Sequence, residues 1–292
     1  MPELPEVDAL ASYLRETALG RVVERVEPVA VSALKTFDPP PSALRGATLA
    51  AVERHGKFLD LVFATPDGER LDLVTHLARA GWLRWRPSQP AAPARPGRGP
   101  LALRVVFDDR SGFDLTEAGT QKRLAVHLVR DPAEVAGIAR LGVDPLAAEF
   151  TVAVLAEILT AAGRAQVKGV LTDQARIAGV GNAYSDEALW AARLSPFRPA
   201  GALDEREVAA LHAGLVGVLT EAREAARGLG AGDLKAEKKA NLSVHGRRGL
   251  PCPRCGDTIR EVSFADRALQ YCPTCQTGGR PLADRRLSRL LK

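Results

Sequence analysis

The C-terminal part of the chain contains two C-x2-C spacings, Cys252-Pro253-Arg254-Cys255 and Cys272-Pro273-Thr274-Cys275, separated by sixteen residues. These four are all the cysteines in the 292 residues. Two such pairs at this separation fit tetrahedral coordination of zinc by two tight turns. Disulfides are the alternative, but the sequence shows no secretion signal and no further cysteine, so we expect one structural zinc. A closed four-cysteine site folds its segment and leaves no position for catalysis.

The segment between the cysteine pairs predicts a β-hairpin. Ile259–Ala265 and Leu269–Tyr271 are its expected strands, and Asp266-Arg267-Ala268 is its expected tip. From Lys235 to Lys292 there are 13 Lys or Arg and 5 Asp or Glu, a net charge of +8 within a chain of net charge +5. This concentration of positive charge indicates either a docking surface for a polyanion or a solvated basic tail.

The middle of the chain is predicted to be helical. Helices are expected over 151–162 and from a capping box at Asp204 and Glu207 to about residue 227. Between them, a new helix is expected to start after Gly181-Asn182. Its first N–H groups can bind an anion, but the turn can equally be a packing element without a ligand. The polar segment 235–243 is interpreted as a linker.

The first half of the chain has the pattern of a β-sandwich. Several short apolar runs separated by turn residues are typical of two packed antiparallel sheets. A helix over 6–18 is expected to hold the N-terminus against the body. The expected strands are 21–31, 48–54, 57–64, 71–76, 81–86, 101–107 and 123–129.

The chain begins Met1-Pro2-Glu3-Leu4-Pro5-Glu6. If Met1 is removed, Pro2 presents a secondary amine that can attack an aldehyde-like carbon and form an iminium. Glu3 beside it can act as a general acid or base. Taken alone, these residues fit an ordinary terminus better than a catalytic one. Their interpretation depends on the rest of the chain.

The overall composition is that of a globular protein, with 46% apolar and 26% charged residues. No run of 18 apolar residues is present, so we expect no membrane span and no membrane partner. The acidic start interrupted by Pro5 does not fit a secretory signal. We therefore expect a cytoplasmic protein.

Together, these features resemble the formamidopyrimidine-DNA glycosylase/endonuclease VIII family over essentially the whole chain. The resemblance rests on the stretch from Pro2 to Val7, on the turn at Asn182 and on the four-cysteine finger. It implies an α+β multidomain fold: an N-terminal β-sandwich with an N-terminal helix, a helix-two-turns-helix domain and a C-terminal zinc-finger hairpin. The corresponding domain boundaries are 1–131, 132–243 and 244–278, followed by a basic tail over 279–292.

The resemblance also implies catalytic roles. Pro2 is expected to attack C1′ of the damaged nucleoside and form a Schiff base, while Glu3 protonates the sugar oxygen. Lys57 matches the lysine of the family's β-turn, which contacts phosphate and is associated with β-elimination. Arg267, at the finger tip, matches the family's phosphate-binding arginine, and Glu6 matches a supporting carboxylate.

Further positions match the family's DNA-binding side. Asn182 matches the phosphate-binding asparagine of the helix-two-turns-helix element. Lys168 is expected to be another phosphate contact, and Glu187 a second supporting carboxylate. An enzyme that acts on a base must extrude it from the duplex, and grips on the flanking phosphates stabilise the bent, flipped state.

The chain departs from the family where a Met, Arg and Phe-like trio normally fills the space left by the extruded base. Arg79 stands where methionine is expected, and Met1 is the single methionine of the chain. The best match for the other two positions is Arg123 and Leu124. A planar guanidinium can stack between bases, but it differs physically from an apolar plug. We therefore expect an altered lesion or DNA-context preference.

The resulting hypothesis is a monomeric bifunctional DNA glycosylase and abasic-site lyase of base excision repair, acting on damaged double-stranded DNA. It would excise oxidised bases and nick the strand by β- and δ-elimination, with one structural zinc and no organic cofactor. The first alternative is a non-catalytic reader of abasic or distorted DNA on the same scaffold. A zinc-ribbon nucleic-acid-binding protein is a third reading, which leaves the N-terminus unexplained.

Overall fold

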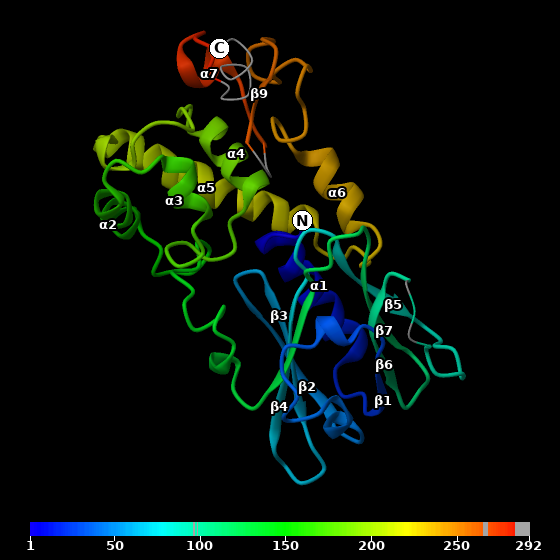
Figure 1. Ribbon diagram of the computed structural model, residues 1–292. Coiled ribbons are helices and arrows are strands. Elements are labelled where there is room, and N and C mark those ends of the chain that lie inside the picture. Colours follow the sequence, from blue (N-terminus) through cyan, green and yellow to red (C-terminus); the bar gives the residue numbers. More distant parts are fainter. Residues whose placement is uncertain (96, 98, 265–267, 284–292) are drawn as a thin grey trace. The chain divides into compact units, whose positions relative to one another are not determined.

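The computed structural model describes residues 1–95, 97, 99–264 and 268–283, which form two compact units (Figure 1). Unit 1 comprises residues 1–141 and 226–235, and unit 2 comprises residues 142–225 and those from 236 onward. The domain boundaries expected from the sequence stay a prediction. The structure adds that the short segment 226–235 folds with the N-terminal unit.

Unit 1 contains two four-stranded antiparallel sheets, which form the predicted two-layer sandwich with one strand more than the seven expected. Apolar residues that alternate along strands of both sheets fill one core, and polar residues alternate with them. The first sheet has the order β1 (Val23–Pro28), β6 (Leu101–Phe107), β7 (Gly112–Glu117), β5 (Gly81–Arg86). The second has the order β2 (Thr48–His55), β3 (Phe58–Ala64), β4 (Arg70–His76), β8 (Ala125–Val129).

Strand β7 was not predicted, because its sequence places a carboxylate in the sheet. Asp114 is buried on β7 and accepts hydrogen bonds from Arg104 Nε and Arg86 Nε, each at 2.8 Å. Burial alone raises the pKa of Asp114, but these bonds outweigh it and lower the pKa below its ordinary value. Paired in this way, a charged residue is tolerated at a buried position of a strand.

Helix α1 (Leu4–Ala18) begins two residues earlier than predicted and packs against the same core. Val7, Leu10 and Leu14 lie at helical spacing and are fully buried. The segment 226–235 joins this unit through a hydrogen bond of 2.7 Å from Trp82 Nε1 to the carbonyl of Ala231. Helix α1 and the segment 226–235 thus pack on the same core.

Unit 2 is built from helices around a second core, as the sequence predicts. Its main helices are α2 (Val152–Ala162), α3 (Val167–Thr172), α4 (Asn182–Ala191) and α5 (Glu205–Ala225). The predicted capping box is present: the N–H of Glu207 donates to Asp204 Oδ1 at 2.8 Å, and the N–H of Asp204 donates to Glu207 Oε2 at 3.0 Å.

The C-terminal part of unit 2 carries the predicted hairpin, with β9 (Arg260–Ser263) paired to β10 (Ala268–Tyr271) and followed by α7 (Pro273–Thr277). The expected linker is instead a helix, α6 (Leu234–Asn241), because its Lys, Ala and Glu residues are strong helix formers. Among the described residues, no helix combines the length and apolar character needed to cross a bilayer. The part of the chain that the structure describes also contains short 3-10 helices at Val31–Ala33, Pro41–Leu44, Pro132–Glu134 and Ala200–Ala202.

Candidate functional site

The N-terminus is held by a reciprocal cap at the start of α1. Glu3 is the N-cap residue, and its N–H donates to Glu6 Oε2 at 2.8 Å. Both carboxylates are buried, with Glu3 only 2% exposed, and Pro2 is buried beside them. Glu6 therefore fixes the backbone that carries Pro2 and Glu3.

Lys57 lies at the turn between β2 and β3, and Arg54 ties this turn to α1. Arg54 donates from Nε to Asp8 Oδ1 at 3.3 Å and from a terminal nitrogen to the carbonyl of Gly56 at 3.2 Å. Gly56 has a φ of 56°, a conformation that glycine adopts without strain. Arg54 thus connects the helix that bears the N-terminus with the turn that bears Lys57.

His76 lies close to Lys57, at the end of β4. Its ring contacts Phe58, which is its cross-strand partner, with ring centroids 4.8 Å apart. Burial, and then the positive charge of Lys57, lower the pKa of His76 to about 4. The imidazole is therefore neutral at pH 7 and can donate or accept a hydrogen bond without adding a second charge beside Lys57.

The expected wedge residues do not share one environment. Arg79 is exposed in the turn after β4, next to Ala78 at a φ of 51°, and Arg123 is exposed as well. Leu124, in contrast, is 2% exposed and belongs to the core of the sandwich. Its placement is a correction to the expected DNA contact, since an inserted side chain has to be accessible.

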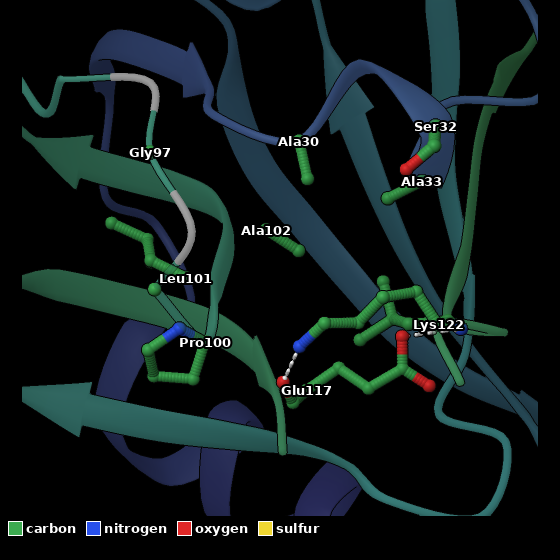
Figure 2. Close-up of a pocket in the computed structure, with 11 residues that line it drawn as sticks. Ala30, Ser32, Ala33, Gly97, Pro100, Leu101, Ala102, Glu117 and Lys122 are labelled. Atoms are coloured by element: carbon green, nitrogen blue, oxygen red, sulfur yellow. Dashed lines mark hydrogen bonds between the residues drawn. The ribbon is translucent and has the colours of Figure 1, made fainter. Parts of the chain in front are cut away.

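Glu117 holds the segment that carries Arg123 and Leu124. Its buried carboxylate accepts the N–H of Arg123 at 2.8 Å and that of Leu124 at 3.0 Å. Lys122 Nζ donates to the carbonyl of Glu117, beside a cavity of about 280 Å³ that is also lined by residues 97 and 99–102 (Figure 2). Leu124 is thus held by the hydrogen bond of its N–H to Glu117 and by the packing of its side chain in the core.

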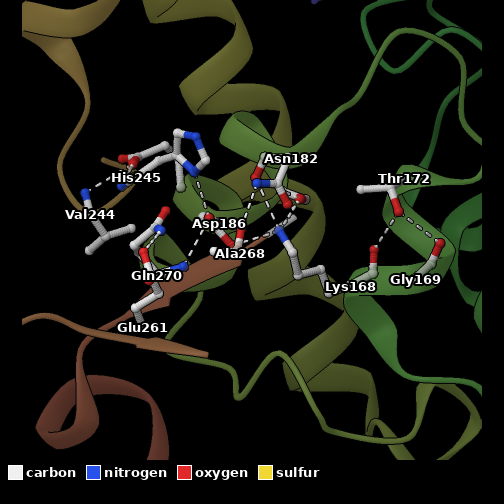
Figure 3. Close-up of polar contacts among 12 residues, drawn as sticks. Lys168, Gly169, Thr172, Asn182, Asp186, Val244, His245, Glu261, Ala268 and Gln270 are labelled. Atoms are coloured by element: carbon white, nitrogen blue, oxygen red, sulfur yellow. Dashed lines mark hydrogen bonds and ion pairs between the residues drawn. The ribbon is translucent and has the colours of Figure 1, made fainter. Parts of the chain in front are cut away.

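The helical turn of unit 2 is organised by Asp186 on α4 (Figure 3). Lys168 on α3 donates from Nζ to Asp186 Oδ1 at 2.6 Å, to Ser185 Oγ at 2.7 Å and to the carbonyl of Asn182 at 3.0 Å. An ammonium group has three donors, and all three are used. The expected phosphate contact of Lys168 is therefore corrected to a positioning role, because a phosphate would have to displace one of these bonds.

The same turn is bonded to the finger hairpin. Asn182 Nδ2 donates to the carbonyl of Ala268 at 2.7 Å, and the N–H of Gln270 donates to Asp186 Oδ2 at 3.1 Å. Ala268 is the last residue of the predicted tip. Arg267 itself lies outside the described residues, so its expected phosphate contact stays a prediction.

Glu187 supports the entry to the finger. Its carboxylate accepts the backbone N–H groups of Ser243, Val244 and His245 at 2.8–2.9 Å. Burial raises the pKa of Glu187, and these three N–H groups act in the opposite direction. Glu187 thus links α4 to the segment that leads into the finger.

The four cysteines form one cluster suited to a tetrahedral metal. Their Sγ atoms all lie within 4.8 Å of one another, with Cys252 to Cys275 at 3.9 Å and Cys255 to Cys272 at 3.4 Å. A zinc ion with bonds of about 2.3 Å separates its sulfur ligands by about 3.8 Å. None of these cysteines, all of which are described, forms a disulfide. The donor set therefore fits zinc.

Comparison with known proteins identifies the family that the sequence resembles. Three family models match in order: Formamidopyrimidine-DNA glycosylase N-terminal domain over residues 1–125, its H2TH domain over 141–231, and the zinc finger found in FPG and IleRS over 249–278. The Formamidopyrimidine-DNA glycosylase of Symbiobacterium thermophilum is 40% identical over 288 residues, covering 94% of this chain and 89% of that protein. The chain belongs to the formamidopyrimidine-DNA glycosylase family. It is a DNA-binding DNA glycosylase of base excision repair with a zinc finger.

Solved structures of the family have the same fold. MutM (Fpg) from Thermus thermophilus superposes with a TM-score of 0.77 at 33% identity, covering 96% of this chain and 100% of that one. Lactococcus lactis Fpg in complex with N7-benzyl-Fapy-dG containing DNA superposes with a TM-score of 0.82 at 25% identity, covering 94% and 100%. The predicted architecture of sandwich, helix-two-turns-helix domain and finger is confirmed.

Four residues of this glycosylase that organise the candidate site were missed by sequence reasoning: Arg54, His76, Asp186 and His245. Each acts through contacts made after folding. Asp186 directly precedes Glu187, and the pair of acids on one buried helix was the available signal. His245 lies in the segment before the finger, and no pattern in the sequence indicates its contact with Asp186.

Proposed function

We propose that this family member is a bifunctional DNA glycosylase and abasic-site lyase that uses Pro2 as its nucleophile on damaged double-stranded DNA. The observation that carries the proposal is the buried start of the chain, where the cap between Glu3 and Glu6 fixes the backbone of Pro2. Solved relatives supply the substrate class. Their described complexes contain DNA with carbocyclic 8-oxo-G, N7-benzyl-Fapy-dG or an abasic site.

The proposed chemistry begins with removal of Met1, which frees the proline nitrogen. That nitrogen attacks C1′, the N-glycosidic bond breaks, and the base leaves with the bonding electrons and is protonated. Opening of the C1′–O4′ bond, with a proton supplied to O4′, gives an iminium. Loss of a C2′ proton then expels the 3′ phosphate, and a second elimination expels the 5′ phosphate. Water hydrolyses the remaining adduct and restores Pro2.

Two side chains of unit 1 have proposed roles in these steps. Glu3 would give the proton to O4′, because its carboxyl group is adjacent to Pro2 and buried. Lys57 would bind a phosphate next to the lesion and assist β-elimination. Its turn is oriented by Arg54 and its neighbour His76 is neutral at pH 7, so Lys57 and Arg54 supply positive charge at this turn.

The proposed DNA grips lie on both units. Asn182 and Arg267 would bind backbone phosphates, supported by the excess of positive charge from Lys235 onward. Arg79 and Arg123, both exposed, would enter or flank the space left by the extruded base. Such phosphate contacts orient the duplex, while stacking by a guanidinium stabilises the flipped state.

The four cysteines would hold one zinc ion. Its chemistry is structural, because four thiolates complete a tetrahedron and no ligand position is left for water or substrate. The ion would fix the two cysteine pairs that precede and follow the hairpin of β9 and β10. That hairpin presents Ala268 to Asn182, so the metal would support the DNA grip indirectly.

A strand-cleavage assay tests the proposal. The purified full-length chain, with its N-terminus defined by intact-mass measurement, is incubated with an end-labelled duplex containing one abasic site. We expect loss of Met1 and a nicked product ending in a 3′ phosphate, the result of successive β- and δ-elimination. An intact strand, with retained binding to the same duplex, would instead support a non-catalytic reader of abasic DNA.

A further inference from the structure

Three metal-ligand side chains lie together on the hairpin that carries Lys57. Glu53 and His55 are two residues apart on β2 and therefore point to the same face of the sheet. Asp60 on β3 is the direct cross-strand partner of Glu53, so it shares that face. The opposite face contributes Val52, Leu59 and Leu61 to the sandwich core. The three polar residues thus lie on the face turned away from the core.

The distances among them suit a small cation. His55 Nε2 lies 3.0 Å from Asp60 Oδ2 and 3.8 Å from Glu53 Oε2, and one ligand atom from each residue lies within 4.8 Å of the other two. Nitrogen and oxygen ligands at about 2.0–2.2 Å from one ion are separated by about 3–3.5 Å. Small rotations of exposed Glu53 would bring all three atoms to bonding distance.

Asp60 gives an independent indication of a missing positive partner. Its side chain is 0% exposed, and within the described residues its Oδ1 atom has no hydrogen-bond partner. A second buried carboxylate, Asp72, lies nearby on β4. Asp72 itself is bound by Arg70 through Nε and a terminal nitrogen, so that guanidinium neutralises Asp72 instead. A buried carboxylate with one contact is costly.

We propose that Glu53, His55 and Asp60 bind one divalent transition-metal ion, separate from the zinc of the four cysteines. One imidazole with two carboxylates suits Mn²⁺ or Zn²⁺, and three protein ligands leave positions for water. Asp60 lies on the buried side of the site, where its Oδ1 and Oδ2 can both bind the ion. Glu53, 45% exposed, forms its open side and gives the ion a route from solvent.

The position of the site suggests what the ion does. His55 precedes and Asp60 follows the turn of Gly56 and Lys57, so an ion bound to both closes the base of that turn. It would add a link across the hairpin to the bonds that Arg54 already makes. The ion would thereby stiffen the turn that presents Lys57. Metal binding itself does not depend on whether the chain cleaves DNA.

Manganese is the appropriate probe, because it prefers oxygen and nitrogen ligands and competes poorly for four thiolates. The zinc-loaded full-length protein is titrated with Mn²⁺, and the free ion is followed by electron paramagnetic resonance. We expect saturable binding of one Mn²⁺ per chain that added Zn²⁺ displaces. His55→Gln and Asp60→Asn should each weaken binding at least about tenfold. His127→Gln is the matched control on the same sheet and should leave binding unchanged.

Thermal unfolding distinguishes a variant that has lost a metal ligand from one that has lost its fold. Mn²⁺ should raise the melting temperature of the wild-type chain and not that of Asp60→Asn. Without added Mn²⁺, Asp60→Asn should melt at the same temperature as the wild type or higher, since it removes a buried charge. Absence of stoichiometric Mn²⁺ binding in the wild type, or equal binding by both ligand variants and the wild type, would overturn the proposal.

Discussion

His245 Nδ1 lies 2.7 Å from Asp186 Oδ2, and the other oxygen of the same carboxylate accepts from Lys168 at 2.6 Å (Figure 3). Asp186 is only 1% exposed. One buried carboxylate therefore joins α3, α4, the segment before the finger and, through the N–H of Gln270, the finger hairpin. The turn that presents Asn182 is fixed by this network.

Replacement of Asp186 by Asn should be strongly destabilising, because it leaves the Lys168 ammonium without its buried partner. We expect a loss of about 3 kcal/mol in the free energy of unfolding, measured by urea denaturation with circular dichroism. Glu205→Gln, at an exposed position, is the control and should change it by less than about 0.5 kcal/mol. A loss below about 1 kcal/mol for Asp186→Asn would contradict the organising role.

His76 should make the protein sensitive to acid. Its pKa is lowered from 6.5 to about 4 in the folded chain, so the unfolded chain binds a proton first as the pH falls. Stability should therefore decline from about pH 6.5 to pH 4, by up to about 3 kcal/mol from this residue. Urea denaturation at about pH 7 and about pH 4.5 measures the decline. His76→Gln should reduce the difference between the two pH values, and an unchanged difference would exclude His76 as its source.

Lys57 is expected to matter for catalysis more than for folding. Lys57→Met should lower the rate of strand nicking at an abasic site by about 10²-fold or more under single-turnover conditions. The same substitution should raise the pKa of His76, since the positive charge of Lys57 helps to depress it. Lys35→Met, elsewhere in unit 1, is the control and should retain nicking. Normal nicking by Lys57→Met, with the His76 pKa shifted as expected, would remove Lys57 from the mechanism.

The exposed Arg79, in place of the expected methionine, should change which lesions are removed. A panel of duplexes with different oxidised bases and opposite bases should show weaker preference for 8-oxoguanine opposite cytosine than is usual in the family. Arg79→Met should increase that preference by about fivefold or more, because it replaces a stacking guanidinium by the methionine expected at this position. Stacking on one base contributes about 1–3 kcal/mol. Arg45→Met controls for the loss of an exposed arginine. Ordinary 8-oxoguanine:cytosine selectivity in the wild type would contradict the expectation.

The elements that the sequence predicts correctly are those with strong local signals. The cysteine spacing, the capping box at Asp204 and the apolar face of α1 each indicate their structure within a few residues. Strand β7 and helix α6 were missed for different reasons. Residues 112–117 include Gly, Asp and Glu, which are uncommon in strands, but Asp114 is paired after folding. Helix α6 is polar and lacks an apolar periodicity, although its residues favour a helix.

The candidate site was only partly predictable, because the sequence gives residue types and not their partners. Lys168 has the charge of a phosphate contact, but the fold turns its ammonium toward Asp186. Leu124 lies in the expected loop, but its side chain completes the core. Both corrections depend on contacts between segments distant in the chain or on the direction of a side chain, which local pattern does not specify.

The central claim is that the nitrogen of Pro2 forms a covalent bond with the sugar at the lesion. Borohydride reduction of the full-length chain with an abasic-site duplex should trap a one-to-one protein–DNA adduct, and peptide mass analysis should place it on Pro2. Absence of any adduct with retained binding to the duplex, an adduct on a lysine, or retention of Met1 on the active protein would contradict the claim.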